Sequence, residues 1–169
     1  MAEEQTATLE VPVASLTKSQ SASIIDRHIL SAMGVGVIPI PLVDILGVGA
    51  VQLNMIRRLA ETHGVEFSEK RARSIIISLV GGALPVFGAL PFASLVQAIP
   101  VVGWSVALSS TVILAGASTY AVGKIMARHF ENGGEMGDFD VTAARERFEN
   151  LFEQGKDAVK SLRKKTSSS

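Results

Sequence analysis

The sequence predicts an all-α, membrane-associated domain built from an apolar helical hairpin and a C-terminal amphipathic helix. The main observation is the segment Ser74–Gly123, fifty residues without a single Asp, Glu, Lys, Arg or His. Basic residues flank this segment on both sides: Lys70, Arg71 and Arg73 precede it, and Lys124 and Arg128 follow it. Beyond Gly134 the chain becomes polar again, with apolar residues at the spacing of a helical packing seam.

The composition excludes several classes of function. Acidic and basic residues balance at 16 each and aromatics make up only 5%, so we expect no nucleic-acid partner. The chain contains no cysteine, which excludes disulfides, thiolate metal sites and cysteine nucleophiles. We therefore expect no cofactor and no metal site.

The domain organisation follows from changes in composition. Residues 1–21 are polar and lack a signal peptide, which predicts a flexible N-terminal arm in the cytoplasm. Residues 22–134 form the predicted apolar helical domain, 138–165 the amphipathic helix and 166–169 a tail. The first helix is predicted to begin at a cap, Ser21 or Ser23, and to continue through SASIIDRHILSAMGV.

The second helix has clear signals at both ends. Pro39 and Pro41 interrupt the chain, and Pro41 is suited to open a helix. Gly64 is a suitable terminator. Asp44 has two interpretations. It is either a first-turn acid that stabilises the helix through the helix dipole, or an acid at membrane depth that marks a transport pathway or an ion pair. Gln52, two turns later, is predicted to hydrogen-bond across helices.

The uncharged segment is long enough for two membrane passes, since one pass needs about 20 apolar residues. The hairpin 74–123 is predicted to turn at Ile99–Trp104 and to have its second limb at Trp104–Gly123. Glycines and prolines between residues 81 and 91 break the first limb, so it is either a kinked span or a re-entrant loop. The basic flanks place both chain ends in the cytoplasm.

The second limb carries a small residue at every fourth position. These are Thr111, Ala115, Thr119 and Gly123. Such a row permits close helix approach, which predicts a packing seam within one chain or between chains.

The final helix is predicted to start after Asp138 and Asp140, which are candidate caps. Its seam repeats at three- and four-residue steps: Val141, Ala144, Phe148, Leu151, Gly155, Ala158 and Leu162. Phe152 and Val159 widen this stripe. We interpret the helix as packed on its own domain or on a neighbour, and its basic end also suits anionic headgroups.

Several short segments together resemble a known family. They are IPIPLVDILGVGAVQLNMIRRLAETHG, AIPVVG, TYAVGKIMARHFENGGEMGDFD and RERFENLFEQGK. The chain is similar, from Ile24 to Lys156, to the bacterial domain of unknown function 697 family, which includes YcjF-like inner-membrane proteins. The positions that match the family are Pro39, Pro41, Asp44, Gln52, Met55, Gly64, Pro100, Gly103, Thr119, Tyr120, Gly123, Phe130, Gly133 and Gly134. The resemblance implies a helical, membrane-associated domain found with P-loop GTPases, and it implies no catalytic residues.

The sequence offers no catalytic motif. GASTYAVGKI lacks the spacing and the hydroxyl residue of a P-loop, so any GTPase is a separate partner. The three histidines, His28, His63 and His129, are too far apart in sequence for a metal motif.

These observations lead to one main hypothesis and two alternatives. The main hypothesis is a non-enzymatic protein of the cytoplasmic membrane that self-assembles and serves as a scaffold or partner, including for a P-loop GTPase. One alternative is a soluble helical oligomer that buries the apolar segment. The other is a small pore or transporter that uses Asp44.

Overall fold

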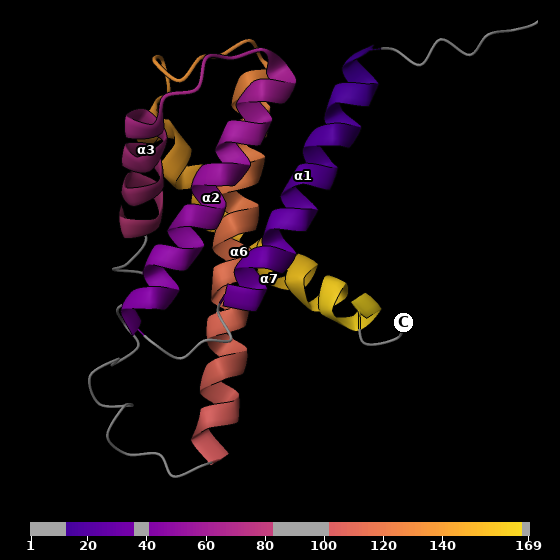
Figure 1. Cartoon of the computed structure of the whole chain (residues 1–169), viewed down its shortest axis with the longest axis vertical. Helices are drawn as coiled ribbons and strands as arrows, with labels where there is room; N and C mark the ends of the chain where they lie inside the picture. The colour runs from indigo at the N-terminus through magenta and orange to yellow at the C-terminus, as the bar shows by residue number, and fades with distance from the viewer. Residues whose placement is uncertain (1–12, 36–40, 83–101, 167–169) are drawn as a thin grey trace, which may run out of the picture.

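The computed structural model describes residues 13–35, 41–82 and 102–166. These residues form helices α1 (Val13–Val35), α2 (Pro41–His63), α3 (Glu69–Gly82), α6 (Val102–Glu131) and α7 (Val141–Thr166). The prediction of an all-α fold is confirmed for this part of the chain. In Figure 1, α2 and α6 run upward, whereas α1 and α3 run downward and α7 crosses behind them.

Helix α6 is the centre of the bundle. It packs against α1, α2 and α7, whereas α3 packs mainly against α2 and α7. The fully buried side chains come from all five helices. They include Ile25 and Ile29 of α1, Met55, Ile56 and Leu59 of α2, Leu79 of α3, Val122 and Met126 of α6, and Phe148 and Val159 of α7.

Small residues on α6 allow its neighbours to approach closely. A Cβ atom at Gly123 would lie 2.9 Å from Ile25 and 3.0 Å from Met55 Sδ, and one at Gly116 would lie 2.6 Å from Val159. Ala115, Thr119 and Gly123 of the predicted row are buried and Thr111 is half-buried. In this structure Thr119 and Gly123 of the row contact helices of the same chain.

Helix α7 lies on α6 along a stripe close to the predicted one. Ala144, Phe148, Phe152, Gly155 and Val159 are buried, whereas Leu151 and Ala158 are half-buried. Phe152 and Val159 therefore lie at the centre of the contact rather than at its edge. Of the two interpretations that the sequence left open, the structure shows α7 packed on its own domain.

The helix ends agree with most of the predicted signals. Helix α2 begins at Pro41 and ends before Gly64, and the Ser68 carbonyl accepts the first hydrogen bond of α3, from the Ala72 N–H. Asp140 caps α7, because its Oδ1 accepts the N–H groups of Thr142 at 2.8 Å and Ala143 at 3.1 Å. Asp138 does not cap α7 and has a different role, described below.

The start of the first helix is corrected by the structure. Helix α1 begins at Val13, so residues 13–21 are helical and not part of a flexible arm. Most residues of these first turns are exposed, and the residue that continues the buried line of Ile25 and Ile29 is the polar Ser21. Residues 13–21 are therefore helical although their sequence lacks the apolar period that would have predicted a helix there.

The end of the predicted hairpin turn also needs correction. Residues 102–104, predicted as part of its turn, are the start of α6. The helices that contain the described parts of the two limbs, α3 and α6, contact each other less than each of them contacts α2 or α7. Close approach at Gly116 and Gly123 pairs α6 with α1, α2 and α7 instead of with α3. Most of the first limb, with the breaks predicted at residues 85–91, and the rest of the turn lie outside the described residues.

Within the ranges that the structure describes, no helix combines the length and the apolar character needed to cross a membrane.

Candidate functional site

Two turns meet at one end of the bundle and form a cleft of about 610 Å³. One is the α2–α3 turn, residues 64–68, and the other is the α6–α7 turn, residues 132–140. We call this site the two-turn cleft. Its lining includes four positions of the family motif and both signs of charge: Gly64, Phe130, Gly133 and Gly134, with Glu66, Arg71 and Glu135.

Each turn has a glycine in the left-handed region as its first or second residue. Gly64 has φ of 68° and Gly133 has φ of 78°, a conformation that disfavours side chains. The Val65 N–H then donates to the Ala60 carbonyl at 2.9 Å, and the Gly134 N–H donates to the His129 carbonyl at 3.0 Å. Both helices thus end in the same glycine-dependent cap, which turns the chain sharply into the cleft.

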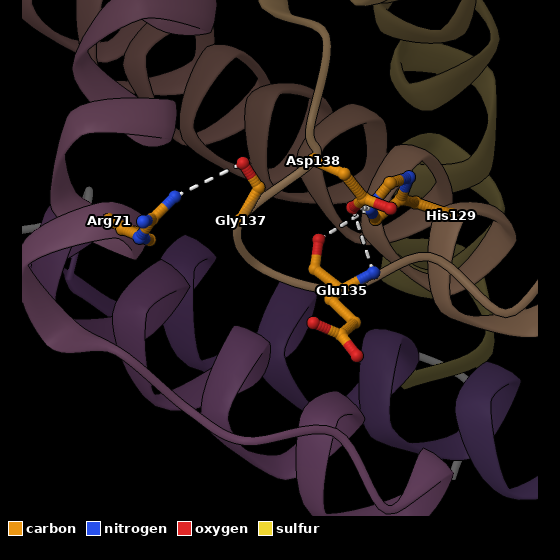
Figure 2. A network of polar contacts seen from close by, with 5 residues as sticks. All are labelled: Arg71, His129, Glu135, Gly137 and Asp138. Carbon is orange, nitrogen blue, oxygen red and sulfur yellow. Dashed lines mark hydrogen bonds and ion pairs between the residues drawn. The ribbon is translucent and has the colours of Figure 1, made fainter.

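His129 and Asp138 close the α6–α7 turn. His129 Nε2 lies 2.7 Å from the Glu135 carbonyl oxygen and 3.1 Å from Asp138 Oδ1. Figure 2 shows these residues grouped at the turn. Both neighbours are acceptors, so Nε2 carries the hydrogen. Asp138 Oδ1 also accepts the Glu135 N–H at 2.8 Å. The His129 ring lies against Gly134, where a Cβ atom would be only 2.5 Å from Nε2.

Arg71 connects the two turns. Its guanidinium, at the start of α3, donates to the Gly137 carbonyl at 3.1 Å (Figure 2). This bond joins residues 66 positions apart in sequence and is solvent-exposed. It holds the α6–α7 turn beside the first turn of α3.

An aromatic row extends the site toward α1. Phe130 lies between His63, at a centroid distance of 6.1 Å, and His129, at 5.8 Å. His129 also contacts Phe139 edge-on at 5.1 Å. His63 Nε2 in turn lies 3.0 Å from the hydroxyl of Ser21, which is only 2% exposed.

The fold therefore gathers two of the three histidines and leaves the third apart. His28 uses its Nδ1 to contact the Ile24 carbonyl, one turn earlier in α1, at 2.7 Å. Among the described residues, no group of three or more His, Cys, Asp and Glu side chains has the geometry to hold a metal ion.

A second polar cluster is buried between α2 and α6. Gln52, which is 1% exposed, donates from Nε2 to the Ser118 hydroxyl at 3.1 Å and to the Thr119 hydroxyl at 3.3 Å. Both hydroxyls donate to the Ala115 carbonyl, at 3.0 and 2.9 Å. The predicted cross-helix bond of Gln52 is confirmed, and it fixes the register of α2 on α6.

The structure separates the predicted site residues into groups. Gly64, Phe130, Gly133 and Gly134 meet in the two-turn cleft, and Gln52 meets Thr119 in the buried cluster. Pro41 and Asp44 lie in α2 and Gly103 lies in α6, but the surroundings of these three residues are not described. Pro39 and Pro100 lie outside the described residues. Sequence reasoning missed the pairing of His129 with Asp138 and the role of Arg71. The one signal in the sequence that could have indicated the pairing is that His129 and Asp138 stand on either side of the Gly133-Gly134 break.

Comparison with known proteins adds two findings. A family model described as "Domain of unknown function (DUF697)" matches residues 4–157. The protein named magnetosome membrane protein 22, from Magnetospirillum gryphiswaldense, is 39% identical over 135 residues, which cover 79% of this chain and 69% of that protein. No solved structure matches the chain.

Proposed function

The chain belongs to the DUF697 family, and from this premise we propose that it is a non-enzymatic helical protein of the cytoplasmic membrane. In this proposal one end of the bundle contacts the bilayer. The opposite end, with the two-turn cleft, faces the cytoplasm. There the protein serves as a scaffold for copies of itself and for a partner such as a P-loop GTPase.

The observation that carries the proposal is the separation of charge along the bundle. In α2 the charges gather at Arg57, Arg58 and Glu61, in α3 they gather in the first turns, and in α6 they begin only at Lys124. Because α3 runs opposite to α2 and α6 (Figure 1), all three helices place their charged segments at the same end. Helix α1 adds its uncharged segment, residues 29–35, to the other end.

Exposed apolar side chains support the same orientation. Leu46 is 69% exposed near the start of α2, Ile77 is 64% exposed in the second half of α3, and Leu30 is 43% exposed in α1. All three lie in the uncharged segments, whereas Leu16, also exposed, lies in the first turns of α1. Full burial of one such side chain stabilises by about 1.5–3 kcal/mol, so contact with lipid is favourable.

Two further features support the proposal. Helix α6 extends beyond the ends of α1 and α2 at the uncharged end (Figure 1), and its sequence is uncharged from Val102 to Gly123. The relative from Magnetospirillum gryphiswaldense is named a membrane protein. Asp44 is the exception to the separation of charge, because this acidic residue lies in the first turn of α2. Its side chain is outside the described residues, so the structure gives no geometry that would assign it to transport.

The two-turn cleft is the surface we assign to a cytoplasmic partner. Its position at the charged end keeps it away from the bilayer in the proposed orientation. Its lining combines exposed Arg71, Glu66 and Glu135 with half-buried apolar residues such as Val65. Mixed polar and apolar lining of this kind is typical of transient protein interfaces.

The membrane proposal is tested by fractionation of lysed cells without detergent. We expect the protein in the membrane pellet after ultracentrifugation, and we expect it to stay there through a sodium-carbonate wash. Detergent extraction and sizing then test self-assembly, with a mass larger than one 17.8 kDa chain as the expected result. Recovery in the first supernatant with a defined oligomer mass would instead support the soluble helical oligomer.

A further inference from the structure

We infer that the basic end of α7 is a binding site for the headgroups of anionic phospholipids. The site consists of Lys160, Arg163 and Lys164 and is called here the α7 basic end. This inference rests on the proposed membrane orientation and specifies which lipids the protein recognises.

Packing places the α7 basic end beside the uncharged part of the bundle. A Cβ atom at Gly116 of α6 would meet Val159 of α7 at 2.6 Å and also Met33 of α1 at 3.1 Å. Gly116 lies two turns inside the uncharged segment of α6, and Met33 lies in the uncharged segment of α1. In Figure 1 the yellow end of α7 accordingly emerges at the height of the lower end of α1, away from the charged turns.

The charges of this end have one sign. Beyond Asp157, the described part of α7 contains basic residues and no acid. Lys160, Arg163 and Lys164 are exposed and recur at three- and four-residue steps, so they share one face of the helix. Lys160 forms an ion pair with Asp157 at 3.2 Å, but both side chains are well exposed, at 62% and 81%. Such a pair is weak and leaves the lysine able to bind an anionic surface.

The opposite end of the bundle has no comparable patch among the described residues. There the basic residues alternate with acids, as in the ion pairs of Arg58 with Glu61 and of Arg73 with Glu69. A surface that carries both signs of charge is attracted only weakly to an anionic membrane. The α7 basic end therefore has the charge, and also the position beside the uncharged part of the bundle, that a headgroup layer requires.

The contribution of the α7 basic end to membrane affinity follows from the free energy that each basic residue gains at an anionic surface. Each Lys or Arg near such a surface improves partitioning by about fivefold, so three residues contribute about 100-fold. Exposed charges are screened as the Debye length falls from about 10 Å at 0.1 M salt to about 3 Å at 1 M salt. The contribution should consequently disappear at high salt.

The test compares two kinds of vesicle with the full-length protein. One kind contains phosphatidylcholine only, and the other also contains phosphatidylglycerol. We expect the variant Lys160→Gln, Arg163→Gln, Lys164→Gln to bind the anionic vesicles about 100-fold more weakly than the unmodified protein. Binding to the neutral vesicles should be unchanged. Circular dichroism verifies that α7 remains helical in the variant.

A matched control removes the same charge from the other end. The variant Arg58→Gln, Lys70→Gln, Arg128→Gln should keep the preference for anionic vesicles within about threefold, since none of these residues faces the headgroups. Equal loss in both variants would overturn the inference, because net charge and not the α7 basic end would be responsible. Equal binding of the unmodified protein to both vesicles would overturn it as well while leaving the membrane proposal intact. Failure to bind either vesicle would contradict both.

Discussion

Phe148→Ala is expected to lower the free energy of unfolding by about 3–5 kcal/mol. Phe148 is 1% exposed and is the largest fully buried side chain of the described residues. Its ring stacks on Phe152 at a centroid distance of 6.0 Å. Truncation removes the apolar contacts and leaves a cavity between α7 and the bundle. A small domain has only about 5–15 kcal/mol of stability, so the loss is a large fraction of the total.

Chemical denaturation of the purified protein, followed by circular dichroism, measures this loss. Ile77→Ala is the matched control, because Ile77 is a large apolar residue in a helix but is 64% exposed. We expect that change to alter stability by no more than about 0.5 kcal/mol. Similar losses in both variants would show that Phe148 is not buried as the structure places it.

Gly155→Val is expected to destabilise the protein by about 3 kcal/mol. A Cβ atom at Gly155 would lie 2.8 Å from the Ala117 carbonyl oxygen and 2.9 Å from the Ala117 Cα. These are backbone atoms of the central helix, which cannot rotate away as a side chain would. Any larger residue must therefore push α7 away from α6 and weaken the contact that Phe148 and Val159 also make.

A second glycine provides the control for this substitution. Gly49 lies within α2, and a Cβ atom there would meet nothing within 4 Å. Gly49→Ala should therefore stabilise the protein by up to about 1 kcal/mol through helix propensity. Gly155→Ala should destabilise it in spite of the same gain. If both alanine variants were stabilised, the close approach of α6 and α7 would be refuted.

The elements that the sequence predicted well are those with strong local signals. Pro41 and Gly64 mark the two ends of α2, and Asp140 marks the start of α7, because each acts through its own backbone geometry or hydrogen bonds. The start of α1 could not be predicted in this way. Its first turns are held by tertiary contacts such as the bond of Ser21 to His63, which is 42 residues away.

The candidate site could be predicted only in part for a related reason. Gly64, Gly133 and Gly134 were identified individually, but nothing in the sequence places the α2–α3 turn beside the α6–α7 turn. Their proximity depends on the parallel course of α2 and α6 and on the bond from Arg71 to Gly137. The common location of the charged segments is likewise a property of helix direction, which the sequence leaves open.

The most direct test of the membrane orientation uses the absence of cysteine from the chain. Single cysteines are introduced by Leu46→Cys and Ile77→Cys at the uncharged end and by Arg58→Cys and Arg128→Cys at the charged end. A nitroxide is attached to each in membranes, and its collisions with oxygen and with a water-soluble nickel chelate are measured. We predict that the labels at 46 and 77 collide preferentially with oxygen, whereas those at 58 and 128 collide preferentially with the chelate. Preferential collision of all four labels with the chelate would contradict the proposal that the uncharged end contacts the bilayer.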